Sequence, residues 1–189
     1  MSERVVVDPV LRTRYRFSRS TGDDGHEVLV VDMEVDPGGG VSPHIHHRMD
    51  ERFTVEAGTA EFLSGRKWIS AGPGETVVVP RGTRHAFRNR GDEVARVHCE
   101  ASPPSTLQEF LEDAAALSRS GAITRHGVPR GPSALLKGAV LVEDYREMVE
   151  LLFPPLPPMP VQRWIMAPLA RLGRRRGYSA PRLADGATG

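Results

Sequence analysis

The sequence predicts a mainly β fold, an antiparallel sandwich or barrel that is followed by a helical extension. Up to about residue 102 the chain consists of short apolar runs separated by turn residues, without a helical period of about 3.6 residues. In the clearest run, 28–35, apolar side chains at odd positions alternate with the polar residues Asp32 and Glu34. From residue 105 onward the apolar spacing becomes that of helices.

Further short strands are expected after this first one, each bounded by glycine, proline or asparagine turns. They are 53–55, 60–63, 68–70, 76–79, 85–87 and 94–101. Brief strands at this spacing are typical of an all-β sandwich or barrel. No internal repeat is visible, which excludes a duplicated barrel.

Two helices are predicted after the β region. The first covers 105–120, with Gly121 as its C-terminal stop. Ser105 and Gln108 have the spacing of a capping box at its start. After a loop rich in glycine and proline, the second helix is predicted over 133–153.

The chain is therefore divided into three parts. Residues 1–102 are the expected barrel, and 103–153 are the expected two-helix extension. Residues 154–189 are expected to hold a proline-rich stretch, a short basic amphipathic piece and a disordered tail. For the amphipathic piece, in which Trp164 precedes Arg174-Arg-Arg176, we favour packing on the barrel or on a dimer partner over contact with a membrane surface.

The composition excludes several classes of protein. Formal net charge is +1, with 25 basic and 24 acidic residues, so no basic field favours nucleic acid. The lone cysteine, Cys99, excludes an intrachain disulfide and a multi-cysteine zinc site, and is expected to be a buried structural thiol. The first residues lack the pattern of a secretory signal, and no stretch approaches the roughly 18 apolar residues of a membrane helix. We therefore expect a cytoplasmic protein.

Three histidines and one glutamate in the β region have the character of metal ligands. His44 and His46 are two positions apart, so on a strand both point to the same face. Glu51 follows past a short turn, and His85 lies on another strand that pairing can bring alongside. Imidazoles with a carboxylate suit Fe, Mn, Ni, Co, Cu or Zn better than Mg or Ca. Such a set predicts one divalent transition metal.

The alternative is that such histidines are exposed loop residues or hydrogen-bonded core residues. For any single histidine this is the better interpretation, and we keep it for His26, His47, His98 and His126. His47 in particular is adjacent to a candidate ligand but points to the opposite face of a strand.

The candidate ligands fall within two motifs that resemble those of the cupin superfamily. The first reads Gly38-x5-His44-x-His46-x4-Glu51-x6-Gly58, and the second reads Gly74-x5-Pro80-x-Gly82-x2-His85-x3-Asn89. The resemblance covers about residues 25–102. It implies a single double-stranded β-helix, a jelly-roll-like barrel, in which His44, His46, Glu51 and His85 bind the metal.

Residues that share strand parity with the ligands are expected to line a pocket around the metal. They are Ser42, Phe53, Val55 and Phe87, which make the pocket largely apolar. Such a pocket favours a small apolar or aromatic molecule over a phosphorylated sugar. The resemblance then implies a metal-dependent, dioxygenase-like oxidoreductase in which Glu51 is both a ligand and a catalytic proton acceptor.

Other functions stay open at this point. Similar proteins include isomerases, cyclases and lyases, and a non-catalytic metal or small-molecule binding module is a further alternative. A transcription regulator is disfavoured, because no recognition helix is visible before the barrel. We expect a homodimer, for which Val5-Val6-Val7 is a candidate exchange strand, although this strand can equally pair within its own chain. The helical extension either covers the barrel mouth or forms the dimer interface.

Overall fold

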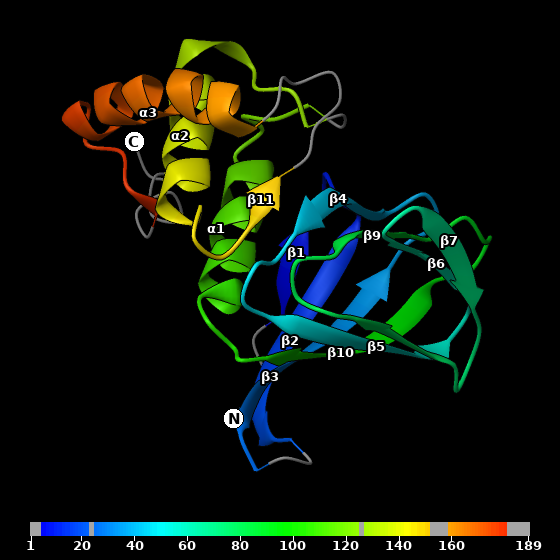
Figure 1. Cartoon of the computed structure of the whole chain (residues 1–189). Helices are drawn as coiled ribbons and strands as arrows, with labels where there is room; N and C mark the ends of the chain where they lie inside the picture. Colours follow the sequence, from blue (N-terminus) through cyan, green and yellow to red (C-terminus); the bar gives the residue numbers. More distant parts are fainter. Residues whose placement is uncertain (1–4, 23–24, 125–126, 152–158, 181–189) are drawn as a thin grey trace.

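The computed structural model describes residues 5–22, 25–124, 127–151 and 159–180 (Figure 1). Within these ranges the chain forms a barrel of two antiparallel sheets with helices packed at one side of it. Most of the predicted proline-rich stretch, the predicted disordered tail from residue 181 and His126 lie outside the described residues. The mainly β fold with a C-terminal helical part is confirmed.

The first sheet follows the order β1-β2-β3-β10-β5-β8 within the described part of the chain. Its strands are β1 (Val6–Asp8), β2 (Thr13–Thr21), β3 (Glu27–Val35), β10 (Ala95–Ser102), β5 (Asp50–Ala57) and β8 (Thr76–Val79). The second sheet follows the order β11-β4-β9-β6-β7. Its strands are β11 (Glu150–Leu151), β4 (Gly40–Ile45), β9 (Arg84–Arg88), β6 (Ala60–Ser64) and β7 (Lys67–Ala71).

The inner faces of the two sheets form the barrel core. On β3 the predicted alternation is confirmed, because the odd positions from Leu29 to Val35 are buried while Asp32 and Glu34 remain partly exposed. Cys99 on β10 lies between Val31 and Phe53 of the flanking strands and is buried, as predicted for a structural thiol.

Strand β2 is absent from the predicted strands because its outward positions are charged. Arg14 donates to Glu34 Oε2 at 2.9 Å and to Asp36 Oδ1 at 2.8 Å, both near the C-terminal end of β3. Arg16 lies 3.4 Å from Glu34 Oε1. Between these arginines, Tyr15 points inward and is 1% exposed. An outward row of ion pairs therefore conceals an ordinary core strand.

Tight turns bring the two predicted motifs into contact. The backbone nitrogen of Gly82 donates to the carbonyl oxygen of His46 at 2.7 Å, which joins the second motif to the first. Asn89 donates to the carbonyl oxygens of Val35 and Glu93 at 2.8 and 2.7 Å. This asparagine therefore satisfies turn backbone at the end of β9.

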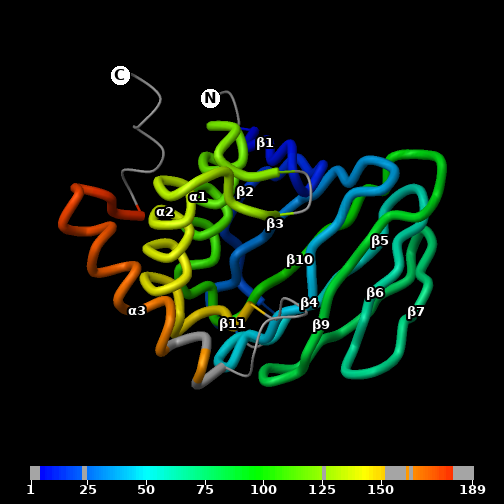
Figure 2. The backbone as a smooth tube through the Cα atoms, turned by 90° about the horizontal axis from the view of Figure 1, so that it is seen from above, coloured from blue at the N-terminus to red at the C-terminus, as the bar shows by residue number. Residues whose placement is uncertain are grey.

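Helices pack beside the barrel in layers. Those in the described ranges are α1 (Leu107–Arg119), α2 (Gly131–Asp144) and α3 (Met159–Arg175). Figure 2 shows α1 next to the barrel, α2 beyond it and α3 outermost. The strand β1 pairs with β2 of its own chain, so the candidate exchange strand is used internally.

The predicted capping box at the start of α1 is wrong. Ser105 lies in a turn with a φ of 48°, and Thr106, which caps the helix, makes no side-chain hydrogen bond. Gln108 instead donates to Glu112 Oε1 at 3.1 Å, one turn further along. The predicted stop at Gly121 is confirmed, since this glycine adopts a φ of 70° just after the helix.

Helix α2 ends at Asp144 and does not continue to residue 153 as predicted. The next residue, Tyr145, is buried, and its hydroxyl donates to Asp113 Oδ2 on α1 at 2.8 Å. Met148 and Val149 then pack into the barrel core. Because these apolar side chains reach the core, the chain leaves the helix and returns to the barrel as β11.

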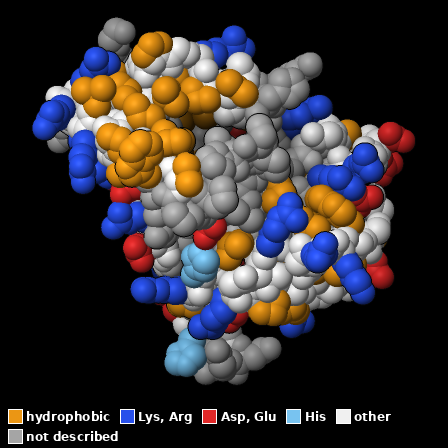
Figure 3. Space-filling view, turned by 45° about the horizontal axis from the view of Figure 1, so that its top comes forward, with side chains coloured by type: hydrophobic (Ala, Val, Ile, Leu, Met, Phe, Trp, Pro, Cys, Tyr) orange, Lys and Arg blue, Asp and Glu red, His pale blue; other side chains and the backbone are white. Residues whose placement is uncertain are grey.

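The predicted amphipathic piece falls on α3, which packs on α2. Ala170 is fully buried, and a Cβ atom at Gly173 would lie 2.8 Å from Val140 Cγ2, so this contact requires a small residue. On the other side of α3 Trp164 is 80% exposed. Figure 3 shows hydrophobic side chains gathered over the helical layer, with basic side chains at its border. Among the described residues no helix is long and apolar enough to cross a membrane.

Candidate metal centre

The four predicted ligands converge inside the barrel. His44 on β4 lies opposite His85 on β9 in the strand register, His46 follows the end of β4, and Glu51 lies on β5 of the other sheet. All four residues are buried, and one ligand atom from each lies within 4.8 Å of the others. Glu51 Oε1 is 3.8 Å from His46 Nε2, and Glu51 Oε2 is 2.7 Å from His85 Nε2.

Backbone carbonyls orient all three imidazoles in the same way. The Nδ1 atom of His44 donates to Ser42 O at 2.9 Å, and that of His85 donates to Thr83 O at 2.9 Å. The Nδ1 atom of His46 donates to the carbonyl oxygen of Met148 at 3.0 Å. A carbonyl oxygen can only accept, so each ring carries its proton on Nδ1 when neutral. The Nε2 lone pairs are thereby left for another partner.

Burial and mutual proximity set the protonation of these side chains. Burial, followed by the charges of His85 and His46, lowers the pKa of His44 to about 3. Burial also lowers the pKa of His46, against the attraction of Glu51. Burial opposes ionisation of Glu51, but contact with His85 and the charges of the other imidazoles lower its pKa to about 2. The first two imidazoles are therefore neutral and Glu51 is a carboxylate.

The pKa of His85, the fourth member of the group, shifts in the opposite direction. Burial lowers the pKa of His85, but the adjacent Glu51 carboxylate outweighs burial and raises it. His85 Nε2 and Glu51 Oε2 are both buried, and neither has an aligned hydrogen-bond partner in the part of the chain that the structure describes. Buried polar atoms without an aligned partner are costly unless a further group binds them.

A divalent transition metal fits this arrangement of donor atoms. Bonds of about 2.1 Å would place neighbouring ligand atoms about 3 Å apart and opposite ones about 4.2 Å apart. The spacing of the group is close to these values. Three nitrogens and one carboxylate match the preferences of Fe, Mn, Ni, Co, Cu and Zn. The four side chains can therefore hold one such ion, and its identity does not follow from the donor set.

Two other histidines, His47 and His98, lie outside this group. His47 is exposed, and its Nε2 atom lies 2.9 Å from Glu150 Oε2 on β11. His98 Nδ1 lies 2.7 Å from Asp32 Oδ1, where these two residues and Glu56 form a more exposed cluster on the other face of the sheet. Exposed clusters of this type are common without a metal.

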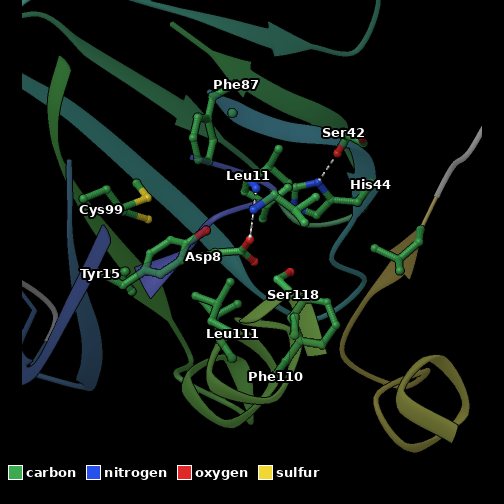
Figure 4. Close-up of a pocket in the computed structure, with 18 of the residues that line it drawn as sticks. Asp8, Leu11, Tyr15, Ser42, His44, Phe87, Cys99, Phe110, Leu111 and Ser118 are labelled. Atoms are coloured by element: carbon green, nitrogen blue, oxygen red, sulfur yellow. Dashed lines mark hydrogen bonds between the residues drawn. The ribbon is translucent and has the colours of Figure 1, made fainter. Parts of the chain in front are cut away.

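His44, His46 and Glu51 line one wall of a cavity of about 500 Å³, which Figure 4 shows with His44 labelled. Three of the predicted pocket residues, Ser42, Phe53 and Phe87, line this cavity. The fourth, Val55, does not line it but is fully buried in the core, because it lies deeper in the barrel than Phe53 on the same face of β5. The prediction of Val55 as a pocket residue is therefore wrong.

Much of the cavity wall comes from segments that the motifs do not include. Helix α1 contributes Leu107, Phe110 and Leu111, and the segments after it contribute Leu141 and Leu151. Figure 4 shows α1 side chains pointing across the cavity towards the barrel strands. The extension therefore covers the barrel mouth, which is one of the two roles considered for it.

Three polar residues in the cavity were also missed. Asp8 and Tyr15 lie near the N-terminus, and Ser118 lies on α1. The sequence held a signal only for Tyr15, whose inward position follows from the alternation of β2. The outward arginines of β2 obscure this alternation. Asp8 is the last residue of a three-residue strand, and the position of Ser118 depends on how α1 docks, so the sequence held no signal for either residue.

Residues 31–99 match the family model of the cupin domain. This segment is a cupin domain. It contains all four metal-ligand candidates, and the helical extension lies outside it.

Comparison with a characterised protein and with solved structures gives partial matches. Mannose-1-phosphate guanylyltransferase ManC of Salmonella typhimurium is 33% identical over 69 residues, which are 36% of this chain and 14% of that enzyme. KdgF from Halomonas sp. is 18% identical, with a TM-score of 0.44 over 51% of this chain and 84% of KdgF. The polyketide cyclase RemF from Streptomyces resistomycificus is 25% identical, with a TM-score of 0.44 over 53% of this chain and 73% of RemF.

Proposed function

We propose that this cupin is a metal-dependent enzyme with dioxygenase-like chemistry on a small, largely apolar or aromatic molecule. One observation carries the proposal: three of the four buried ligand candidates, His44, His46 and Glu51, line a cavity of about 500 Å³ that is mostly apolar. Buried metal-ligand candidates beside an apolar cavity of ligand size support a catalytic site.

The lining of the cavity supports an apolar substrate. Phe53, Phe87 and Phe110 present aromatic side chains, and no lysine or arginine is among the described residues that line the space. Apart from the metal, a phosphorylated sugar would find no cationic partner in this lining, which disfavours desolvation of its phosphate. The proposal therefore departs from the sugar-phosphate substrate in the name of the Salmonella relative.

The ligand residues have distinct tasks in the proposed reaction. His44, His46 and His85 would hold the metal through their Nε2 atoms, each kept in place by its Nδ1 hydrogen bond. The bound ion would supply Lewis acidity and open positions for a substrate oxygen or O₂. Glu51, an ionised carboxylate next to these positions, would bind the ion and accept a proton from the substrate.

Two alternatives remain for the same site, a non-oxidative cupin enzyme (isomerase, cyclase or lyase) and a metal-dependent binding module. We also propose a homodimer, which size-exclusion chromatography with light scattering would test. Elemental analysis of protein purified without added metal distinguishes the oxygenase hypothesis from the two alternatives. Iron or nickel supports the oxygenase, zinc moves weight to the alternatives, and absence of any transition metal contradicts the whole proposal.

Oxygen uptake tests the reaction type directly. Protein reloaded with the metal found is mixed with a panel of catechols and other phenols in an oxygen electrode, and uptake with at least one of them is expected. His85→Ala should abolish this uptake, whereas His98→Ala, which changes an imidazole on the outer face, should retain it. Conversion of a substrate without oxygen uptake would favour the non-oxidative alternative.

A further inference from the structure

The Tyr15 hydroxyl is a buried polar group that the metal centre does not use. Tyr15 lies on the inner face of β2, is 1% exposed and lines the cavity. Its hydroxyl has no hydrogen-bond partner among the described residues. A buried hydroxyl without a partner destabilises the fold. Its presence in a cavity therefore points to a ligand that forms the missing hydrogen bond.

A carboxylate and a second hydroxyl lie beside this phenol. Asp8 is 2% exposed and accepts hydrogen bonds from the backbone nitrogens of Val10 and Leu11 at 2.9 and 3.0 Å. Ser118 of α1 lies next to the Asp8 carboxylate and interacts with it. Figure 4 shows Tyr15, Asp8 and Ser118 directed towards the same part of the cavity, which His44 borders from β4.

The protonation of this pair determines what it can bind. Burial and the nearby Asp8 charge raise the pKa of Tyr15, so the phenol keeps its proton and can donate. Burial also raises the pKa of Asp8, while its two backbone hydrogen bonds and Ser118 oppose this change. Both backbone hydrogen bonds go to Asp8 Oδ1, so Oδ2 is the acceptor for a ligand in this part of the cavity, next to a phenol that donates.

We propose that Tyr15 and Asp8 form a second polar binding site in the cavity, which takes a neutral hydroxyl group of the ligand. This inference rests on the proposed function, because it describes the other end of the molecule that the metal centre would bind. A hydroxyl accepts from the Tyr15 phenol and donates to the Asp8 carboxylate at the same time. A carboxylate or phosphate would be repelled by Asp8, and a carbonyl could accept from Tyr15 but could not donate to Asp8.

The inferred ligand class follows from the two ends together. Its body is apolar, because phenylalanine and leucine side chains line the cavity that both sites border. One end carries oxygen atoms that can reach the metal group, and the other carries an alcohol or phenol hydroxyl. Ser118 places α1 in contact with this second site, so the extension takes part in selecting the ligand.

Matched pairs of catechols that differ by one hydroxyl test the inference. Suitable pairs are 4-methylcatechol with 3,4-dihydroxybenzyl alcohol, and 4-ethylcatechol with 3,4-dihydroxyphenylethanol, whose hydroxyls reach to different depths. Binding is measured by titration calorimetry on the zinc-loaded full chain, because zinc does not oxidise catechols. For at least one pair the hydroxyl compound should bind about tenfold more tightly.

The variant Tyr15→Phe should remove this preference and leave zinc content and the affinity for 4-ethylcatechol unchanged. It should fold, because it keeps the ring and loses only an unpaired hydroxyl; Ser118→Ala provides a second variant, which should weaken the preference. No preference in the wild-type protein, or an undiminished preference in Tyr15→Phe, would overturn the inference. Failure of the protein to retain any transition metal would instead contradict the proposed function, so the two failures are distinguishable.

Discussion

The Nδ1 atom of His46 donates to the carbonyl oxygen of Met148, which lies 3.0 Å away and 102 positions later in the chain. This bond joins a candidate metal ligand to the segment after α2. The same segment continues as β11, which pairs with β4 beside His44. The helical extension therefore orients the metal centre as well as covering the cavity.

We expect His46→Ala to lose bound metal while keeping its fold. The substitution removes one of four donor atoms, and the barrel strands are held by their own pairing. His47→Ala is the matched control, because His47 is adjacent but exposed and outside the group. Metal content is measured by elemental analysis, with circular dichroism for the fold. Equal metal content in the two variants would refute the assignment of His46 as a ligand.

We expect Leu111→Trp to block apolar ligands without affecting the metal. Leu111 lines the cavity from α1, so a larger side chain there fills space that a ligand would occupy. Leu135→Trp is the control, since Leu135 on α2 is 39% exposed. Affinity for 4-ethylcatechol should fall at least tenfold in the first variant only. If both variants bind equally, the cavity is not the binding site.

Gly58→Ala should destabilise the barrel more than Gly65→Ala does. Both glycines have positive φ, 69° and 62°, so both variants strain the backbone by about 1 kcal/mol. Only at Gly58 would the new Cβ lie 2.7 Å from a backbone atom, the carbonyl oxygen of Val94. We expect an additional loss of about 1–3 kcal/mol there, measured by urea unfolding. Equal losses of unfolding free energy in the two variants would show that the backbone at Val94 shifts without cost to accommodate the new Cβ atom.

Asp113→Asn should stabilise the protein at neutral pH. Burial is the main cause that raises the pKa of Asp113 to about 6, and neighbouring carboxylates add to it, although Tyr145 donates to this group. The unfolded pKa is about 4, so the folded state binds more protons between about pH 4 and 6. The contribution of Asp113 is therefore fully present below about pH 4 and is lost as pH rises through about 6.

Asparagine stays neutral at every pH and keeps an acceptor oxygen for Tyr145. The variant should be more stable than wild type by about 1–2 kcal/mol at pH 7.5, and the difference should shrink at pH 5. Urea unfolding at both pH values measures this. Asp92→Asn, at an exposed position, controls for the change in net charge. A pH-independent difference would show that Asp113 is not the group that titrates.

The local pattern of residues was enough to predict the barrel and the candidate ligands. Alternating apolar positions specify strands, and each ligand belongs to a motif in which a few residues set the turn and the side-chain direction. The outward arginines of β2 hid one strand from this reasoning. The end of α2 was also missed, because Tyr145 and Met148 continue a helical spacing but are buried in the barrel and on α1.

Sequence alone thus determined that this chain carries a cupin barrel with four metal-ligand candidates. Only the tertiary structure decided that the extension lines the cavity, that Met148 orients His46, and that Tyr15 and Asp8 face the same space. The physical reason is the sequence separation between the residues that make contact. A ligand motif acts through neighbours on one or two strands, whereas docking of α1 and β11 depends on contacts between residues about a hundred positions apart.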